Sequence, residues 1–283
     1  MKTGLVLEGG GLRGAYTAGA LAWFLNEGIE FDYNVGISSG AQHLSNYLTK
    51  DSKYLKDIAV TIGAQEFRKG FKALFTEGTL VGYNHLFDYT LKHIAPLDLE
   101  KLRKDPRESE VGIFDVKAGK SKWIRTQDID DDYKVLKAAS LIPLAGRAVV
   151  IDGIKYIDAG VEHMIPIERS IEKGVDKHVV ITTKPRSYVR EPTGFWTNVI
   201  MSILYYPYKT FRKMVKNRSD IYYHQRNIID ELVKEYKAIE IYPSKPFNIG
   251  RFGGDFTELN GLFEMGFNDC EARKDEIYKF LEM

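Results

Sequence analysis

The sequence is poor in the features that mark secreted, membrane-spanning and nucleic-acid-binding proteins. It has a single cysteine, Cys270, so no disulfide can form within the chain, as expected in a reducing compartment. It has no run of 18 or more apolar residues, so we expect no transmembrane helix. Its positive and negative side chains nearly cancel, at a formal net charge of +1. We therefore expect a cytoplasmic protein that binds no nucleic acid.

The chain also lacks linkers and repeats. No stretch rich in proline, glycine and serine divides its 283 residues, of which 44% are hydrophobic. This favours one domain over residues 1–283, with 184–283 as the less certain part, a helical region that could form a lid or a membrane-facing cap. Residues 15–25 are apolar, but a glycine-rich run with Glu8 and Arg13 precedes them, so we expect a buried helix there rather than a signal peptide.

The first fifty residues alternate between strand and helix patterns. Residues 3–8 and 31–37 are typical of buried strands, and 13–27 and 40–49 of helices, the first ending at Gly28. This alternation favours an α/β fold with a mostly parallel central sheet. Further along we expect helices over 52–105, 132–139, 220–237 and 258–282, strands over 111–117, 122–126, 177–183 and 238–242, and a hairpin over 147–158 with its turn at Asp152-Gly153.

A glycine-rich loop follows the first strand, in the order Gly9, Gly10, Gly11, Leu12, Arg13, Gly14. Glycines let several N–H groups point at one place, and the helix that follows adds partial positive charge. Such a nest can hold a phosphate or the oxyanion formed when an acyl carbonyl is attacked. The same spacing also fits a dinucleotide-binding fingerprint, or a tight turn that binds nothing.

A second turn follows the second strand, where Gly36-Ile37-Ser38-Ser39-Gly40 fits the pattern G-x-S-x-G. Gly36 and Gly40 allow the chain to fold back sharply, which exposes the central serine at a helix N-terminus. We therefore expect Ser38 to be a nucleophile and Ser39 to be structural, as a cap of the helix. Parallel strands end at the same edge of a sheet, so a nucleophile and an anion nest would meet there.

A serine needs a base to accept its proton, and none of the six histidines lies in a distinctive motif. Asp158-Ala159-Gly160 ends the expected hairpin, where a turn would fix the direction of the carboxylate. Burial would raise the pKa of this carboxyl group and make it a better base. Asp158 could also simply cap the next turn, and Asp152 is accounted for by the hairpin.

Together these segments resemble the bacterial patatin-like phospholipases. Residues 9–14 are similar to the oxyanion loop of that family, Gly36 to Gly40 to its nucleophile elbow, and Asp158-Ala159-Gly160 to its D-G-G/A motif. Two further segments, 139–143 and 161–166, also resemble family segments, and the likeness extends over residues 3–167.

The resemblance implies a three-layer α/β/α fold and a lipid acyl hydrolase of the phospholipase A or lysophospholipase type. It implies a Ser38–Asp158 dyad that forms an acyl-enzyme, with an oxyanion held by residues 9–14 and with Ala159 and Gly160 supporting the aspartate. This chemistry requires no metal and no cofactor.

Residues 194–208 are unusually aromatic, and their apolar side chains fall on one helical face. Residues 184–218 hold eight Lys or Arg against one Glu, a net charge of +7. Such a stretch, 194–218, is a candidate for peripheral contact with an anionic membrane. A core helix with a basic solvated edge would give the same pattern.

Two other functions remain open from the sequence. An α/β-hydrolase-type esterase would use a Ser-His-Asp triad, with His178 or His224 as its base. A non-catalytic nucleotide-, phosphate- or lipid-binding protein would use the glycine loop, with Ser38 inert.

Overall fold

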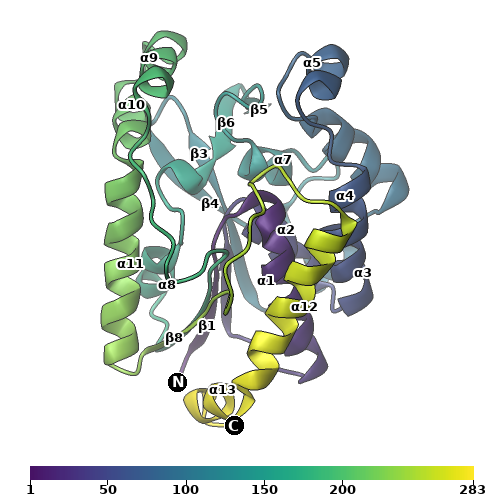
Figure 1. Cartoon of the computed structure of the whole chain (residues 1–283), viewed down its shortest axis with the longest axis vertical. Coiled ribbons are helices and arrows are strands. Elements are labelled where there is room, and N and C mark those ends of the chain that lie inside the picture. Colours follow the sequence, from purple (N-terminus) through teal and green to yellow (C-terminus); the bar gives the residue numbers. More distant parts are fainter.

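A computed structural model describes all residues, 1–283, and shows a central sheet between two layers of helices (Figure 1). This confirms the predicted three-layer α/β/α fold with a mostly parallel sheet. The eight strands are β1 (Thr3–Leu7), β2 (Tyr33–Gly36), β3 (Glu108–Asp115), β4 (Lys120–Arg125), β5 (Val149–Ile151), β6 (Ile154–Asp158), β7 (Lys177–Ile181) and β8 (Ala238–Ile241).

The sheet has the order β5-β6-β3-β2-β1-β7-β8, and β4 also pairs with β3. Strands β3, β2, β1, β7 and β8 run parallel, whereas β4, β5 and β6 are antiparallel to their neighbours. Side chains alternate between the faces of the sheet. On β1, Leu5 and Leu7 face the larger core, and Val6 faces a smaller core formed with α8 and α11.

The helices divide between the two faces of the sheet. Helices α8 and α11 cover one face, and α1, α2, α7 and α12 are among those that cover the other (Figure 1). The α-helices are α1 (Gly14–Asn26), α2 (Ser39–Leu48), α3 (Ser52–Lys56), α4 (Gly63–Gln65), α5 (Phe71–Glu77), α6 (Leu99–Lys104), α7 (Lys134–Ser140), α8 (Ile167–Glu172), α9 (Phe195–Leu204), α10 (Lys209–Lys216), α11 (Arg218–Lys234), α12 (Phe256–Ala272) and α13 (Lys274–Leu281). The π-helices are η2 (Asp57–Ile62) and η3 (His85–Ile94), and the 3-10 helices are η1 (Gly11–Arg13), η4 (Thr126–Asp128) and η5 (Ala159–Val161).

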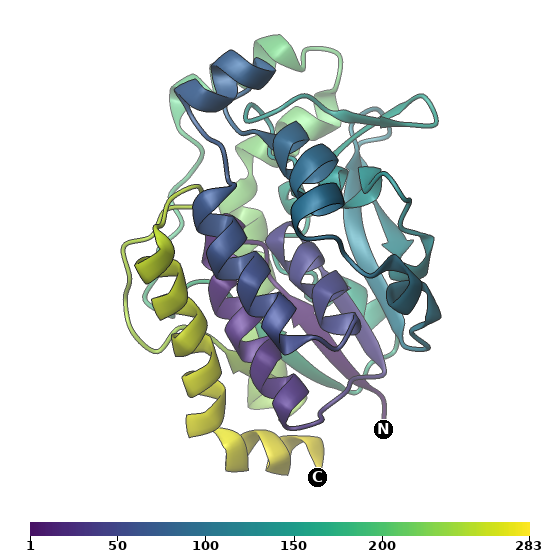
Figure 2. The ribbon, with the colours of Figure 1, turned by 90° about the vertical axis from the view of Figure 1, so that its right-hand side faces the viewer.

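Helix α12 from the end of the chain lies directly against α1 from its beginning (Figure 2). Gly19 and Gly266 make this approach possible, since a Cβ atom at either would lie within 2.1 Å of a carbonyl oxygen on the other helix. Tyr16 then donates a hydrogen bond to Asp269, and Trp23 donates one to Glu271. The C-terminal helix is thereby packed onto the helix that follows the glycine-rich loop.

Most of the predicted elements lie within a few residues of their expected positions. The hairpin turns at Asp152 and Gly153, which have φ values of 50° and 76°, and α1 is followed by Gly28 at a φ of 67°. No helix has both the length and the apolar composition needed to cross a bilayer.

Candidate active site

The register of the sheet brings together the ends of strands that are far apart in the sequence. Leu7 of β1 is paired with Gly36 of β2, so the loops after both strands leave the same edge of the sheet. Gly36 is also paired with Val111 of β3, and two residues further along β3, Ile113 is paired with Asp158. Ser38 lies two residues beyond Gly36, so the register places it level with Asp158.

Ser38 lies on a sharp turn between β2 and α2. Its backbone has φ 56° and ψ −125°, a conformation that a residue with a side chain rarely adopts. The turn is so tight that a Cβ at Gly36 would lie 2.5 Å from the carbonyl oxygen of Gly40. Gly36 and Gly40 therefore permit the crossing that presents Ser38 in a cavity, with 7% of its surface exposed.

Asp158 ends β6 and is 5% exposed. Its carboxylate accepts a hydrogen bond from the Gly160 N–H at 2.7 Å and shares a cavity with Ser38, whose hydroxyl lies near enough to act on its pKa. Burial raises the pKa of Asp158. The Gly160 N–H, the nearby Ser38 hydroxyl and the charges of Arg218 and Arg251 oppose this shift without cancelling it. The carboxylate is therefore more basic than a solvated one.

Ala159 is completely buried, at a position that has room only for a small side chain. It packs beside Gly112, where an added Cβ would lie 3.1 Å from the Ala159 Cβ and 2.5 Å from Ile37. Alanine fits this space, so the departure from glycine leaves the turn after Asp158 intact.

Several N–H groups of the glycine-rich loop are already engaged. Gly9 donates to the Met164 carbonyl at 3.2 Å, Gly10 to Ser39 Oγ at 2.9 Å, and Leu12 to the Arg251 carbonyl at 2.9 Å. The N–H groups of Gly11 and Ser39 have no hydrogen-bond partner. The predicted cap role of Ser39 is wrong, because its hydroxyl binds the loop across the site instead of the N-terminus of α2.

The loop is also anchored by its longer side chains and neighbours. Arg13 Nε donates to the Ile249 carbonyl at 2.8 Å, which ties the loop to the segment before α12. Gly14 has no room for a side chain, since a Cβ there would lie 2.8 Å from the His43 ring. Arg13 thus serves here as an anchor.

A buried ion pair supports the start of the same loop. Glu8 is completely buried and binds Lys184, as well as the N–H of Thr183 at 2.6 Å and its hydroxyl at 2.9 Å. Thr183 in turn packs against Gly10. The sequence analysis did not assign this role to Lys184, because nothing local to the sequence marks its partner 176 residues away.

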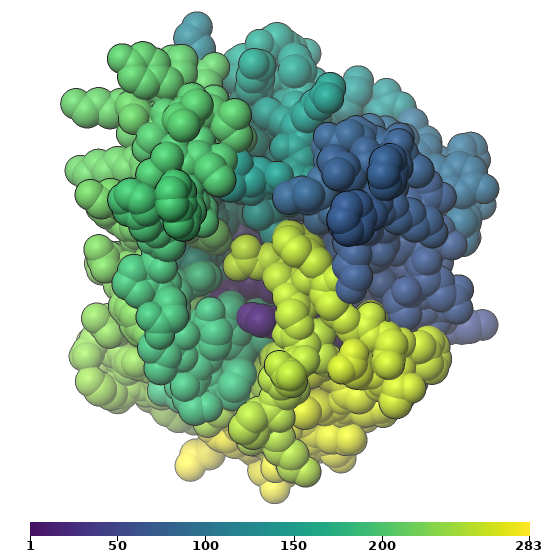
Figure 3. Space-filling view, turned by 45° about the horizontal axis from the view of Figure 1, so that its top comes forward, coloured from purple at the N-terminus to yellow at the C-terminus, as the bar shows by residue number.

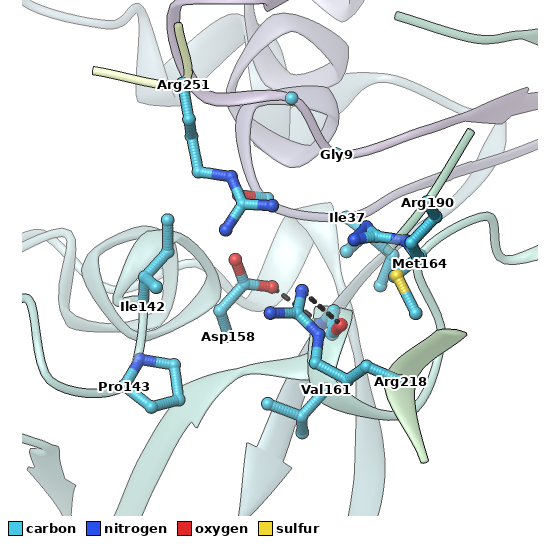
Figure 4. A pocket seen from close by; sticks show the side chains of 13 residues that line it. Gly9, Ile37, Ile142, Pro143, Asp158, Val161, Met164, Arg190, Arg218 and Arg251 are labelled. Carbon is cyan, nitrogen blue, oxygen red and sulfur yellow. Dashed lines mark hydrogen bonds between the residues drawn. The ribbon is translucent and has the colours of Figure 1, made fainter. Parts of the chain in front are cut away.

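Two cavities meet at Ser38. One also contains Asp158 and the side chains of Arg190, Arg218 and Arg251 (Figure 4). The other is mainly apolar and is lined by residues such as Leu12, Ile58, Ile62, Phe67, Leu86 and Phe252. A hollow is visible on the surface between the green and yellow segments, with purple N-terminal atoms at its floor (Figure 3).

The three arginines were not predicted as site residues. Arg190 and Arg218 were counted only within the basic stretch 184–218, and Arg251 follows a glycine in a loop that carries no motif. Their common position follows from tertiary packing alone.

No histidine contacts the pair formed by Ser38 and Asp158. His178 lies at the start of β7, at the opposite end of the strands, and bonds to Ser170 Oγ at 2.9 Å. His224 is largely exposed and lies 3.6 Å from Glu168. His43 is buried beside the apolar cavity, where burial lowers its pKa to about 4 and its Nδ1 has no partner.

Residues 5–171 match the family model described as patatin-like phospholipase, which is more than half of the chain. The chain belongs to the patatin-like phospholipase family. It is therefore a member of a family of lipid hydrolases, for which lipid is the implied substrate. Residues 208–282 match a second model, described as a domain of unknown function (DUF6363).

Two individual proteins are similar over most of the chain. The uncharacterized protein YjjU of Escherichia coli is 27% identical over 286 residues, covering 94% of this chain and 75% of the relative. The crystal structure of VipD from Legionella pneumophila superposes with a TM-score of 0.49 at 12% identity, covering 97% of this chain and 67% of that one.

Proposed function

We propose that the protein is a lipid acyl hydrolase of the phospholipase A or lysophospholipase type, with Ser38 as nucleophile and Asp158 as base. The observation that carries the proposal is the placement of Ser38, on a strained turn, beside the buried Asp158 carboxylate in one cavity. In a family of lipid hydrolases, a strained serine beside a basic carboxylate is the expected arrangement for acyl transfer.

The reaction proceeds in two halves. Asp158 accepts the proton of Ser38 Oγ while Oγ attacks the ester carbonyl, and the tetrahedral intermediate then collapses to an acyl-enzyme. The alcohol leaves with the proton from Asp158. Water then gives a proton to Asp158 and attacks the acyl-enzyme, and the fatty acid leaves as Ser38 regains its hydrogen.

The oxyanion in this mechanism is held by the N–H groups of Gly11 and Ser39. Both groups lack partners, whereas those of Gly9, Gly10 and Leu12 are bound elsewhere. One donor comes from the loop after β1 and the other from the residue after the nucleophile, as in other serine hydrolases with a nucleophile elbow. Loss of one such donor typically lowers kcat by about 10²–10³.

The apolar cavity accommodates the acyl chain. It opens at Ser38 and extends between η1, η2, η3 and the segment around Phe252. Each methylene group buried there contributes about 0.8 kcal/mol of binding. A long-chain ester is thereby favoured over a short one, as a lipid hydrolase requires.

The two alternative functions fit the site less well. A Ser-His-Asp triad would need a histidine next to Ser38, and both His178 and His224 lie elsewhere with other partners. A binding protein would not need a serine held at φ 56° against a buried carboxylate. His178→Gln and His224→Gln should therefore leave ester turnover within about twofold of wild type.

Covalent labelling and turnover test the proposal directly. A fluorophosphonate probe should add one label to the wild-type protein and none to Ser38→Ala, as measured by intact-protein mass spectrometry. Asp158→Asn should lose more than 10³ in kcat, whereas the matched control Asp152→Asn, in the hairpin turn, should keep full activity. Full turnover by Ser38→Ala or Asp158→Asn would remove that residue from its role.

We further propose that residues 1–283 work as a single patatin-like domain with a membrane-facing cap. Helix α9 exposes its apolar face, with Phe195, Trp196 and Ile203 each at least 70% exposed, so the core-helix interpretation is wrong. Across the same end of the molecule, α5 exposes Phe71 and Phe75 at 78% and 85% (Figure 1).

An anionic bilayer is the surface that fits this end of the molecule. The exposed lysines of α10, Lys209, Lys213 and Lys216, lie next to the aromatic helix α9. Apolar side chains with adjacent lysines are the combination that binds anionic lipid. The hollow between the green and yellow segments comes into view when this end of the molecule is turned forward (Figure 3).

Vesicle flotation tests the cap. The protein should float with phosphatidylcholine vesicles that contain phosphatidylglycerol, and the double variant Phe195→Ser/Trp196→Ser should not. The control Ile171→Ser, at an exposed site on α8, should float like the wild type. Flotation that is equal for all three proteins would reject the assignment.

A further inference from the structure

Three guanidinium groups share the cavity of Ser38 and Asp158. Arg190 comes from the segment between β7 and α9, Arg218 is the first residue of α11, and Arg251 lies in the loop before α12. Figure 4 shows the side chains of Arg218 and Arg251 pointing toward the Asp158 carboxylate, with Arg190 beside Met164. The arginines therefore converge on the site from three separate segments.

None of these arginines forms an ion pair of the kind that usually holds a buried arginine. Arg218 donates to the Gly160 carbonyl at 3.2 Å, and Arg190 lies over the Tyr222 ring at 4.8 Å. The Nε atoms of Arg190 and Arg218 are buried without a partner, and the side chain of Arg251 makes no hydrogen bond. Arg107 and Arg169, by contrast, each bind a carboxylate within 2.9 Å.

The charge of the cavity is unbalanced. Three arginines and one ionised aspartate give a net charge of +2. Burial, together with the neighbouring charges of Arg251 and Arg190, lowers the pKa of Arg218 to about 9. Burial and the charge of Arg190 also lower the pKa of Arg251. Such a cluster is unfavourable by itself and is stabilised by a bound anion.

We propose that Arg190, Arg218 and Arg251 bind a phosphate group of the substrate, so that the preferred substrates are acyl esters that carry a phosphomonoester next to the scissile bond. This inference rests on the proposed function. A phosphomonoester carries a charge near −2 at neutral pH, which matches the cavity, whereas a carboxylate would leave it positive. Guanidinium groups are also the donors that best match phosphate oxygens.

The position of Ser38 supports the same orientation of the substrate. It lines both the cationic and the apolar cavity, so an ester bound at its hydroxyl would extend in two directions. The acyl chain would enter the apolar cavity, and the alcohol part would lie among the arginines. A glycerol phosphate ester with a single acyl chain has this division between an apolar and an anionic end.

The inference also gives the C-terminal region a role. Residues 208–282 match a domain of unknown function and supply both Arg218 and Arg251. The segment that matches the patatin-like model supplies Ser38 and Asp158. The C-terminal region would therefore select the head group of a substrate that the N-terminal region cleaves.

Substrate pairs with the same acyl chain provide the test. We would measure kcat/KM for lysophosphatidic acid and for the matching monoacylglycerol, both below their aggregation concentrations. The variants are Arg190→Gln and Arg251→Gln, whose side chains hold no other segment by hydrogen bonds. Lys245→Gln is the control, because it removes one exposed charge from the loop that carries Arg251 without lining the cavity.

The wild type should prefer lysophosphatidic acid, and each arginine variant should lose about tenfold to hundredfold of this preference, as expected for a hydrogen bond to a charged group. Turnover of monoacylglycerol should fall far less than turnover of lysophosphatidic acid in each arginine variant, and Lys245→Gln should behave as wild type. Equal turnover of the two esters by the wild type, or an unchanged preference in both arginine variants, would overturn the inference.

A binding measurement separates this inference from the proposed function. With Ser38→Ala, lysophosphatidic acid should raise the melting temperature, and the added substitution Arg251→Gln should abolish the effect. If the wild type hydrolyses neither ester, the proposed function fails, and this binding measurement alone decides whether the arginines hold phosphate. If inorganic phosphate stabilises the protein as well as the lipid does and the esters are cleaved equally, the cluster serves a free anion and the substrate assignment is wrong.

Discussion

Replacing Gly11 by alanine would test how the structure holds the first loop in its active position. Gly11 has a φ of 62°, and a Cβ there would lie 2.3 Å from the carbonyl oxygen of Arg251. Real Cβ atoms essentially never approach within 3.0 Å of another heavy atom, so the two segments would have to separate by at least 0.7 Å, the difference between these distances. The Leu12 N–H to Arg251 carbonyl hydrogen bond, 2.9 Å long, would break or lengthen as a result.

A matched control isolates the steric part of this effect. Gly28 has a φ of 67°, and a Cβ there would meet nothing within 4 Å. Gly28→Ala should therefore cost about 1 kcal/mol, which is the conformational penalty alone. Gly11→Ala should cost this amount plus about 1 kcal/mol for the lost hydrogen bond and further strain from the clash, or about 2–3 kcal/mol in total.

Urea unfolding followed by tryptophan fluorescence would measure both variants. If the unfolding free energy falls by about 3 kcal/mol per M urea, the urea midpoint of Gly28→Ala should fall by about 0.3 M and that of Gly11→Ala by about 0.7–1 M. Since the Gly11 N–H is a proposed oxyanion donor, Gly11→Ala should also lose about 10²–10³ in kcat, whereas Gly28→Ala should keep it. Equal midpoints together with full turnover in both variants would refute the assigned geometry.

Three other predictions concern charge and chain length. Glu8→Gln should lower the unfolding free energy by about 3–5 kcal/mol, because it leaves Lys184 buried without its partner, and an unchanged urea midpoint would contradict this. Although burial acts to raise the pKa of Glu8, the charge of Lys184 and hydrogen bonds lower this pKa. The stability that Glu8 contributes is therefore present above about pH 4.5 and is lost as the pH falls further. In the Glu8→Gln variant, the unfolding free energy should depend less on pH in this acid range. Because burial raises the pKa of Asp158, kcat/KM should rise with pH through a value above 3.8, and activity that stays constant down to that pH would argue against this base. For monomeric esters, kcat/KM should rise about fourfold per added methylene of the acyl chain until the apolar cavity is full. Ala59→Phe fills part of that cavity and should shorten the acyl chain that gives the highest kcat/KM. An unchanged chain-length preference would place the acyl chain elsewhere.

The sequence was sufficient to predict the elements around Ser38 and Asp158 because their signals are local. A strand that ends in G-x-S-x-G and a hairpin that ends in an aspartate can each be recognised within a dozen residues. The rule that parallel strands end at one edge then relates the loops after β1 and β2. The position of Asp158 near Ser38 follows from the register of β3, which pairs with both β2 and β6.

Other parts of the site depend on contacts that no local pattern records. Ser39 follows the nucleophile in a position typical of a cap, yet its hydroxyl binds Gly10, which becomes a neighbour only when the strands pair. The helical period of 195–204 was predicted, but a period does not distinguish a core helix from an exposed one. The three arginines come together because α12 packs on α1 and α11 covers the other face of the sheet.

The arginines and the base are electrostatically coupled, and this links substrate recognition to catalysis. The charges of Arg218 and Arg251 act to lower the pKa of Asp158. A phosphate bound to the arginines would offset their charge, so the carboxylate would become more basic when a phosphate-bearing ester is present. A neutral ester bound at Ser38 would leave that charge in place. The proposed substrate would therefore strengthen the base that deprotonates Ser38, because one cavity contains both groups.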